Sequence, residues 1–314
     1  MMVDVHRQFR QVDVFAEEPF VGNPVAVVHG ADGLTDEEMR LFARWTNLSE
    51  TTFLLPPTDE RADYRVRIFT PTRELPFAGH PTLGTAHAWL EAGGPPARRD
   101  VIVQECTVGL VPLRRTSQGL AFRAPPTMRS GPVDEQTLHE IAAVLGVERA
   151  ELVDAQWADN GPGWVAVELA SAEAVLAVRP GSTERKIGVF GRYPAGSPEA
   201  IEVRAFFSAG AGTLEDPVTG SLNASLAQWL LASGKATAPY TASQGTVLGR
   251  RGRVHVSTDA DGAVWIGGGT HTLISGSVLL LRSPFSSTVE RQRSADDARP
   301  SAGECRRRDL ECPV

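Results

Sequence analysis

Three ionisable residues stand beside features that suit proton transfer, although they are far apart in the sequence. Glu50 lies in NLSETTFLL, between a predicted helix and an apolar strand. A carboxyl group with apolar neighbours tends to have a raised pKa, which suits a general acid/base. From spacing alone, however, a solvated carboxylate at a helix end explains Glu50 more simply. His80 lies at a predicted helix start, where the helix dipole favours a neutral imidazole, and Asp216 is also consistent with a simple capping carboxylate.

Two glycine-containing turns precede predicted helices. The first is AGHPT, with Gly79, and the second is VTGS, with Gly220 and Ser221. Helix N-termini expose unpaired N–H groups and a partial positive charge, and glycine lets a ligand approach the backbone. Two such ends facing each other across a cleft would bind a carboxylate or an enolate oxygen. Ordinary helix capping explains each turn taken alone, and only their duplication favours a binding site.

The duplication extends beyond these turns. Residues 66–93 resemble residues 203–234: each segment has a VRxF strand, a polar loop, a glycine turn and a helix that ends in Trp-Leu. Four matching elements in the same order predict a pseudo-duplicated α/β (α+β) fold. The alternative is two generic strand–helix units. The helices at 80–92 and 220–233 carry apolar residues around most of their circumference, so we expect both to be central and buried.

Other local patterns define the remaining organisation. Short strands are predicted at 11–15, 24–28 and 64–69, and Thr35 and Glu38 form a capping box that starts a helix.

We predict a first domain over residues 1–125 plus about 276–284, and a second domain over residues 126–275. The linker is APPTMRSGPVDEQT (124–137), which is rich in Pro, Ser and Gly. Residues 285–314 contain few large apolar side chains and are expected to form a disordered tail.

Composition excludes several classes of protein. A net charge of -7 over 314 residues argues against a nucleic-acid partner. The cysteines (Cys106, Cys305 and Cys312) have no CxxC spacing, so neither a disulfide framework nor a metal site is expected. No apolar run is long enough for a membrane span or a secretory signal, which predicts a cytoplasmic protein. Nucleotide-binding glycine motifs are absent. The only lysines, Lys186 and Lys235, suggest a coding bias with no bearing on mechanism.

Four motifs together carry a specific resemblance. VDVFAEEPFVGNPVAVV, NLSETTFLL, ELPFAGHPTLGTAHAWL and EDPVTGSLNASLAQWL, in this order, resemble the PhzF-like family of phenazine-biosynthesis isomerases over about residues 8–282. The resemblance implies a diaminopimelate epimerase-like fold: two pseudo-symmetric domains, each a curved mixed sheet around a central helix, with the site between them. In the epimerase, two cysteines face each other at the starts of those helices. Here those places hold Gly79-His80 and Asp216, so a two-thiol mechanism is not supported.

The resemblance also implies roles for the candidate residues. Glu50 would take a proton from one carbon and return it to another, while His80 and Asp216 would orient the substrate's amine. The positions that would bind the substrate carboxylate are Gly79, Gly220 and Ser221. Leu222 departs from the family, which more often has alanine there, and is expected to narrow the pocket.

The implied reaction is a cofactor-independent isomerisation, without a metal, in secondary-metabolite or antibiotic biosynthesis. Its substrate would be a small carboxylate such as trans-2,3-dihydro-3-hydroxyanthranilate or a 4-alkylproline precursor, and we expect a homodimer. An amino-acid epimerase or racemase on the same fold is one alternative, which needs two opposed acid/bases. A non-catalytic carboxylate-binding protein is the other, although pure binding of an anion gains nothing from a nearby carboxylate such as Glu50.

Overall fold

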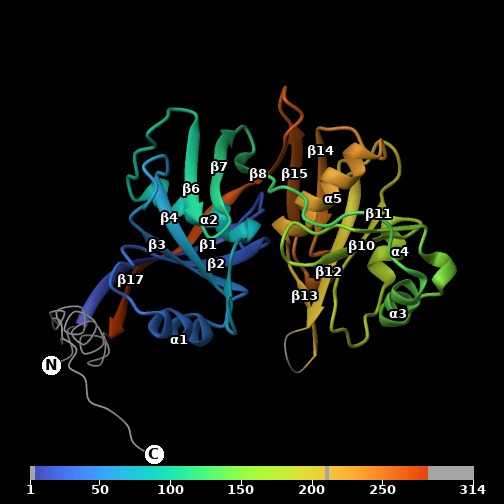
Figure 1. Cartoon of the computed structure of the whole chain (residues 1–314), viewed down its shortest axis with the longest axis horizontal. Helices are drawn as coiled ribbons and strands as arrows, with labels where there is room; N and C mark the ends of the chain where they lie inside the picture. Colours follow the sequence, from blue (N-terminus) through green and yellow to red (C-terminus); the bar gives the residue numbers. More distant parts are fainter. Residues whose placement is uncertain (1–3, 209–211, 282–314) are drawn as a thin grey trace, which may run out of the picture.

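The strands of this protein form one continuous mixed sheet that curls around two helices. The computed structural model describes residues 4–208 and 212–281. Figure 1 shows two halves side by side, with α2 (Gly79–Glu91) among the strands of the first half and α5 (Gly220–Ala232) among those of the second. This arrangement confirms the predicted mixed α/β fold class. The predicted disordered tail, 285–314, lies outside the described residues.

The first half has the hydrogen-bonded strand order β17–β1–β2–β3–β4–β6–β7–β8, with β5 paired to β4. The pairs β2–β3 and β4–β6 are parallel and the others are antiparallel. The bounds of these strands are β1 (Asp4–Val14), β2 (Asn23–Val28), β3 (Glu50–Leu55), β4 (Tyr64–Phe69), β5 (Glu74–Leu75), β6 (Val101–Cys106), β7 (Gly109–Thr116), β8 (Gly119–Arg123) and β17 (Thr270–Leu281).

The second half repeats this pattern in the order β9–β10–β11–β12–β14–β15–β16, with β13 paired to β12. Here the parallel pairs are β10–β11 and β12–β14, and β16 pairs with β8 to join the halves. The bounds are β9 (Asp154–Trp157), β10 (Trp164–Glu168), β11 (Lys186–Arg192), β12 (Ile201–Ser208), β13 (Thr213–Asp216), β14 (Tyr240–Gln244), β15 (Gly252–Thr258) and β16 (Val264–Gly268). Because the sheet is continuous, the domain limits stay a prediction.

The repeat also extends to individual side chains. Arg67 on β4 forms a bidentate ion pair with Glu74, with both N···O distances at 2.7 Å. At the corresponding place on β12, Arg204 contacts Glu215 in the same way, at 2.9 and 2.7 Å. A planar guanidinium matches a carboxylate in this geometry. Each half therefore uses the same ion pair to hold the short strand that leads into its central helix.

The two central helices are buried on nearly all sides. In α2, residues 79–86 are buried, and in α5, residues 220–227 are buried, as the apolar circumference of both helices predicted. The other helices lie on the outside of the sheet (Figure 1), namely α1 (Asp36–Thr46), α3 (Glu135–Leu145) and α4 (Ala172–Ala177). Two short 3₁₀ helices, η1 (Arg149–Glu151) and η2 (Thr246–Leu248), complete the described elements.

Local sequence explains where several elements begin and end. The predicted capping box starts α1: the Glu38 N–H donates to Thr35 Oγ1 at 3.3 Å, and the Thr35 N–H donates to Glu38 Oε2 at 2.8 Å. The predicted strand at 11–15 is longer in the structure, because β1 begins at Asp4 and pairs along its whole length with β17. Across residues 4–208 and 212–281, no helix combines the length and the apolar character needed to cross a membrane.

Candidate active site

The first turns of the two central helices abut each other. A Cβ atom added to Gly79 would lie 2.7 Å from the Cα atom of Gly220, so only glycine allows this approach. Neither helix has a side-chain hydrogen bond at its N-cap, whereas α1, α3 and α4 are capped by Thr35, Asp134 and Ser171. Uncapped N–H groups at a buried helix end favour an anionic ligand. The two helix starts therefore supply donors to one common space.

Glu50 lies beside these helix starts. It is the first residue of β3, and its side chain is 16% exposed. Two residues later on the same face of the strand, the Thr52 hydroxyl accepts a hydrogen bond of 2.8 Å from Thr85 on α2. Glu50 Oε2 lies 3.3 Å from His80 Nε2 on α2, without the alignment of a hydrogen bond. The strand thus aims the Glu50 carboxyl at the start of the central helix.

Burial perturbs the pKa of both groups in this contact. The pKa of Glu50 is raised to about 8, first by burial and then by the negative charge of Asp216, and Lys186 opposes this shift. The pKa of His80 is lowered to about 3 by burial, against a hydrogen bond to the Pro24 carbonyl. At neutral pH the contact therefore joins a mostly protonated acid to a neutral ring. A carboxyl group that titrates near pH 8 can both accept and release a proton under physiological conditions.

Asp216 comes to the same place from the second half of the chain. It ends β13, and its Oδ1 atom accepts a hydrogen bond of 2.9 Å from the Asn23 amide. Its Oδ2 atom accepts one of 2.5 Å from the Thr219 hydroxyl. Burial raises the pKa of Asp216 to about 6, although both hydrogen bonds favour the charged form. Asp216 is consequently ionised at neutral pH, with both of its oxygens already engaged.

Asn23 connects the two halves at the site. It is the first residue of β2 and is fully buried. Besides Asp216, its amide nitrogen donates to the Val218 carbonyl at 3.0 Å and lies 3.3 Å from His80 Nδ1. Asn23 was not among the residues predicted for the site. Its position in FVGNPVAVV, directly before an apolar strand, was the available signal.

Two glutamines hold the starts of the central helices. Gln244 Oε1 accepts hydrogen bonds from the Thr219 N–H at 3.0 Å and from the Asn223 amide at 2.8 Å. In the first half, the Gln104 amide donates to Thr82 Oγ1 at 3.0 Å. Both glutamines lie on the strand that follows the central helix and runs parallel to β4 or β12. They occupy matching positions in the repeat, which was the signal for their role.

Ser221 is held from two sides in the first turn of α5. Its hydroxyl oxygen accepts a hydrogen bond of 3.1 Å from the Trp164 indole, and its carbonyl accepts one of 3.0 Å from Asn160. The hydroxyl hydrogen is thereby left to donate to a ligand. Leu222 is buried against Gly188 on β11, where a Cβ atom would lie 2.4 Å from a Leu222 methyl group. The expected narrowing of the substrate pocket by Leu222 stays a prediction.

The structure thus brings every predicted site residue into one region between the halves, namely Glu50, Gly79, His80, Asp216, Gly220 and Ser221. Cys106 is not part of it: the thiol lies on β6, with Sγ 3.7 Å from the Gly109 carbonyl.

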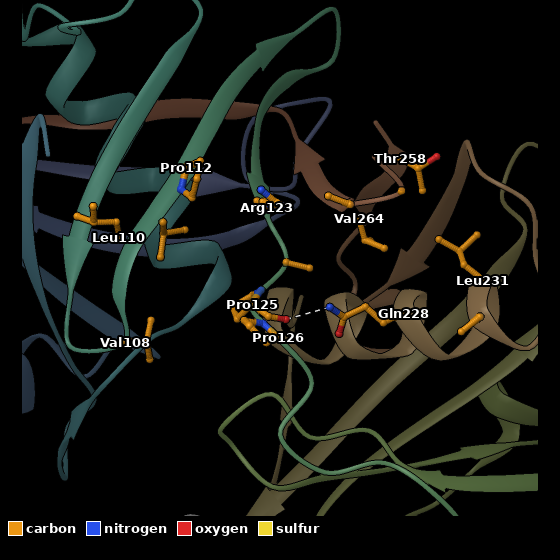
Figure 2. A pocket seen from close by; sticks show the side chains of 15 residues that line it. Val108, Leu110, Pro112, Arg123, Pro125, Pro126, Gln228, Leu231, Thr258 and Val264 are labelled. Carbon is orange, nitrogen blue, oxygen red and sulfur yellow. Dashed lines mark hydrogen bonds between the residues drawn. The ribbon is translucent and has the colours of Figure 1, made fainter. Parts of the chain in front are cut away.

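A cavity lies elsewhere between the halves. It has a volume of about 770 Å³ and a mainly apolar lining that includes Val108, Leu110 and Leu231, with Arg123 and Thr258 among its polar residues (Figure 2). The Gln228 amide closes part of it by donating to the Pro125 carbonyl at 2.9 Å. None of the predicted site residues lines this cavity, and it offers no acid/base for catalysis. The predicted acid/base residues lie instead at the helix starts.

A duplicated sheet around two central helices whose starts abut each other defines an epimerase-like fold. The fold is shared with a probable proline racemase from Agrobacterium radiobacter K84, at a TM-score of 0.58 and 15% identity over 89% of this chain and 94% of that one. Residues 12–276 match the family described as phenazine biosynthesis-like protein. The chain belongs to this PhzF-like family and is an isomerase.

Individual relatives cover nearly the same span. A trans-2,3-dihydro-3-hydroxyanthranilate isomerase from Pseudomonas aeruginosa is 35% identical, over 80% of this chain and 90% of that protein. Antisense-enhancing sequence 1 from Schizosaccharomyces pombe is 36% identical, over 85% of this chain and 97% of that protein. The crystal structure of a PhzF-family protein from Bacillus anthracis aligns with a TM-score of 0.74 and 26% identity, over 88% of this chain and 99% of that one.

Proposed function

We propose that this chain is a cofactor-independent isomerase in which Glu50 moves a proton between two carbons of a small unsaturated amino or carboxylic acid. One observation carries the proposal: the buried Glu50 carboxyl group, 3.3 Å from His80 and with its pKa raised to about 8, lies at the uncapped starts of the two central helices. The helix starts suit the carboxylate of a substrate, and the acid beside them suits a proton that must be taken and returned.

The proton transfer requires no other reactant. Ionised Glu50 takes a proton from one carbon, and the electron pair of the broken C–H bond delocalises toward the substrate's carboxylate. N–H groups of α2 and α5 stabilise the negative charge that develops there. Protonated Glu50 then gives the proton to a second carbon, which restores the carboxylate. Ionised Asp216 binds the substrate's ammonium group, and neutral His80 helps to orient the substrate's amine.

The geometry favours this reaction over epimerisation. An epimerase without cofactors needs a second acid/base on the opposite face of the reacting carbon. Asp216 is the nearest candidate, but the hydrogen bonds that it accepts from Asn23 and Thr219 favour its ionised form over the protonated form that would have to deliver a proton. A purely binding protein is disfavoured as well, because the binding of an anion gains nothing from a titratable carboxyl group buried beside it.

The relatives suggest the first substrates to test. Because one relative is named as a trans-2,3-dihydro-3-hydroxyanthranilate isomerase, we propose this compound as the first test substrate and a 4-alkylproline precursor as the second. The proposal includes a role in secondary-metabolite or antibiotic biosynthesis, in the cytoplasm, as a homodimer. Multi-angle light scattering tests the dimer directly, and a mass equal to that of one chain would contradict it.

NMR of the reaction in deuterated water tests the proton shuttle. We expect Glu50→Gln to lower the rate by ~10²–10⁴ while substrate binding persists, because the amide keeps the shape but cannot transfer the proton. Partial retention of the migrating hydrogen is expected in the native protein. Glu37→Gln, on the exposed side of α1, is the matched control and should keep full activity. Full activity in Glu50→Gln, or deuterium entering at a single inverted stereocentre, would contradict the shuttle.

A further inference from the structure

The hydroxyl hydrogen of Ser221 has no acceptor in the described part of the chain, although the residue is only 6% exposed. A serine in a helix commonly donates to the carbonyl three or four residues earlier. Ser225, one turn later in α5, does so to the Ser221 carbonyl at 3.1 Å. Ser233, at the end of the helix, does so to the Trp229 carbonyl at 2.8 Å. Ser221 lies in the first turn and keeps its hydrogen for a ligand.

The indole of Trp164 restricts the direction in which this hydrogen can point. Its Nε1–H donates to Ser221 Oγ at 3.1 Å, and both side chains are buried. A hydroxyl has one hydrogen and two lone pairs, whereas an indole nitrogen can only donate. The contact therefore occupies a lone pair of Ser221 and excludes the orientation in which its hydrogen faces the ring. The hydroxyl is thus kept as a donor on its other sides.

The loop between β9 and β10 fixes the position of Trp164. The Ala158 N–H donates to the Trp164 carbonyl at 3.0 Å, which closes the loop. Inside it, Asp159 Oδ1 accepts hydrogen bonds from the N–H groups of Gly161 at 2.7 Å and Gly163 at 2.6 Å. Both glycines have positive φ angles, of 130° and 90°, which other residues rarely adopt. The local sequence DNGPG therefore specifies where Trp164 begins its strand.

The same loop also holds the backbone of Ser221. Asn160 is 4% exposed, and its amide donates to the Ser221 carbonyl at 3.0 Å. The segment DNGPGW (159–164) thus brings two donors to one residue, one to its carbonyl and one to its hydroxyl oxygen. A group that is already held in this way loses little orientational freedom when a ligand binds. The loop therefore preorganises the first turn of α5.

We propose that Trp164 is a positioning residue of this isomerase, whose indole N–H holds the Ser221 hydroxyl as a donor to the carboxylate of the substrate. Trp164 acts through Ser221, and it was not among the residues predicted for the site. The inference rests on the proposed function for the place of the carboxylate at the start of α5. It also makes Trp164 a determinant of specificity. A carboxylate presents only acceptors to the oriented hydroxyl, whereas the N–H₂ group of a carboxamide would face another donor.

Calorimetric titration with two probes of the same shape tests the proposal without requiring turnover. The probes are 2-aminobenzoate and 2-aminobenzamide, which replaces the carboxylate by a carboxamide. We expect Ser221→Ala to weaken the binding of 2-aminobenzoate about 10-fold, as for the loss of a hydrogen bond to a charged group. Trp164→Phe keeps a buried ring without the N–H and should weaken it about 3- to 10-fold. Both variants should affect 2-aminobenzamide much less. The double variant should bind 2-aminobenzoate no more weakly than Ser221→Ala, because Trp164 acts only through that hydroxyl.

Trp265→Phe is the matched control, because Trp265 is also buried and its indole also donates, to Asp259 Oδ2 at 3.0 Å in the turn between β15 and β16. It should leave the affinity for both probes unchanged. Additive losses in the double variant would overturn the proposal. Unchanged binding of 2-aminobenzoate by Trp164→Phe would do so too, as would an equal loss for both probes, which a merely structural role would give. The same holds if the native chain does not bind 2-aminobenzoate.

NMR of the indole N–H groups gives a second test that does not require Trp164→Phe to fold. The chain has six tryptophans, each with one indole signal. In Ser221→Ala, one signal should move upfield because the Trp164 N–H has lost its acceptor, and an unchanged indole spectrum would overturn the proposal. Both tests are independent of Glu50, because they measure binding and local structure. Uncoupled Trp164 and Ser221 with an active Glu50 shuttle, or the reverse, therefore separate this inference from the proposed function.

Discussion

Replacing Glu50 by glutamine should stabilise the protein while it destroys activity. The pKa of Glu50 is 4.5 in its ordinary state and about 8 in the fold, mainly because burial disfavours the charged form. The folded chain therefore holds a proton that the unfolded chain has already released. As the pH rises from about 4.5 to about 8, the ionisation of Glu50 in the unfolded chain lowers the free energy of unfolding. Glutamine does not ionise, so the variant does not lose this stability.

The size of the effect follows from the pKa shift. Each unit of pH between the unfolded and folded pKa values corresponds to about 1.4 kcal/mol. The loss in the free energy of unfolding caused by Glu50 is close to zero at pH 4 and about 3 kcal/mol at pH 7, and it levels off at about 5 kcal/mol above pH 8. The difference in the free energy of unfolding between Glu50→Gln and the native chain should grow accordingly. Contributions of the amide that do not depend on pH cancel in this comparison.

Urea denaturation at pH 2, 4, 7 and 9 measures this difference. Asp59→Asn is a control of opposite sign: hydrogen bonds from Arg61 lower the pKa of Asp59 to about 2, so its contribution is present above its unfolded pKa and is lost as the pH falls. That variant should be less stable than the native chain at pH 7, by an amount that shrinks toward pH 2. A Glu50→Gln difference that is constant from pH 4 to pH 9, or that declines, would refute the assignment of a raised pKa.

Three further predictions concern catalysis and the repeat. The value of kcat/KM should rise with pH to a plateau above about pH 8, because Glu50 must be ionised to accept the proton; a profile that falls between pH 6 and 8 would contradict this. Gly79→Ala should lower kcat/KM by at least about tenfold, because its Cβ atom would lie 2.7 Å from Gly220 Cα and force the helix starts apart; unchanged kinetics would show that the starts need not meet. Arg204→Met should lower the free energy of unfolding by about 3–5 kcal/mol, because it leaves the largely buried carboxylate of Glu215 without its partner; thermal denaturation measures this loss, and a clearly smaller loss would contradict the prediction.

The repeated elements could be predicted because their signals are local. The capping box at Thr35 and Glu38, the apolar circumference of the central helices and the VRxF strands each depend on residues close together in the sequence. The extension of β1 back to Asp4 could not be predicted, because its partner, β17, comes from the opposite end of the chain. Long-range strand pairing leaves no mark within the paired segment itself.

In the candidate site, too, some features follow from the local sequence and others depend on the tertiary structure. The sequence by itself determined which residue types were present at the two helix starts and, through the repeat, that the starts would be equivalent. Only the tertiary structure decided that Asn23 bridges Asp216 and His80, because these three residues come from distant parts of the chain. Only the structure, too, gave Glu50 its raised pKa, because burial and the charge of Asp216 act through space. A pKa depends on the low-dielectric surroundings and on charges brought near by folding, and sequence spacing specifies neither.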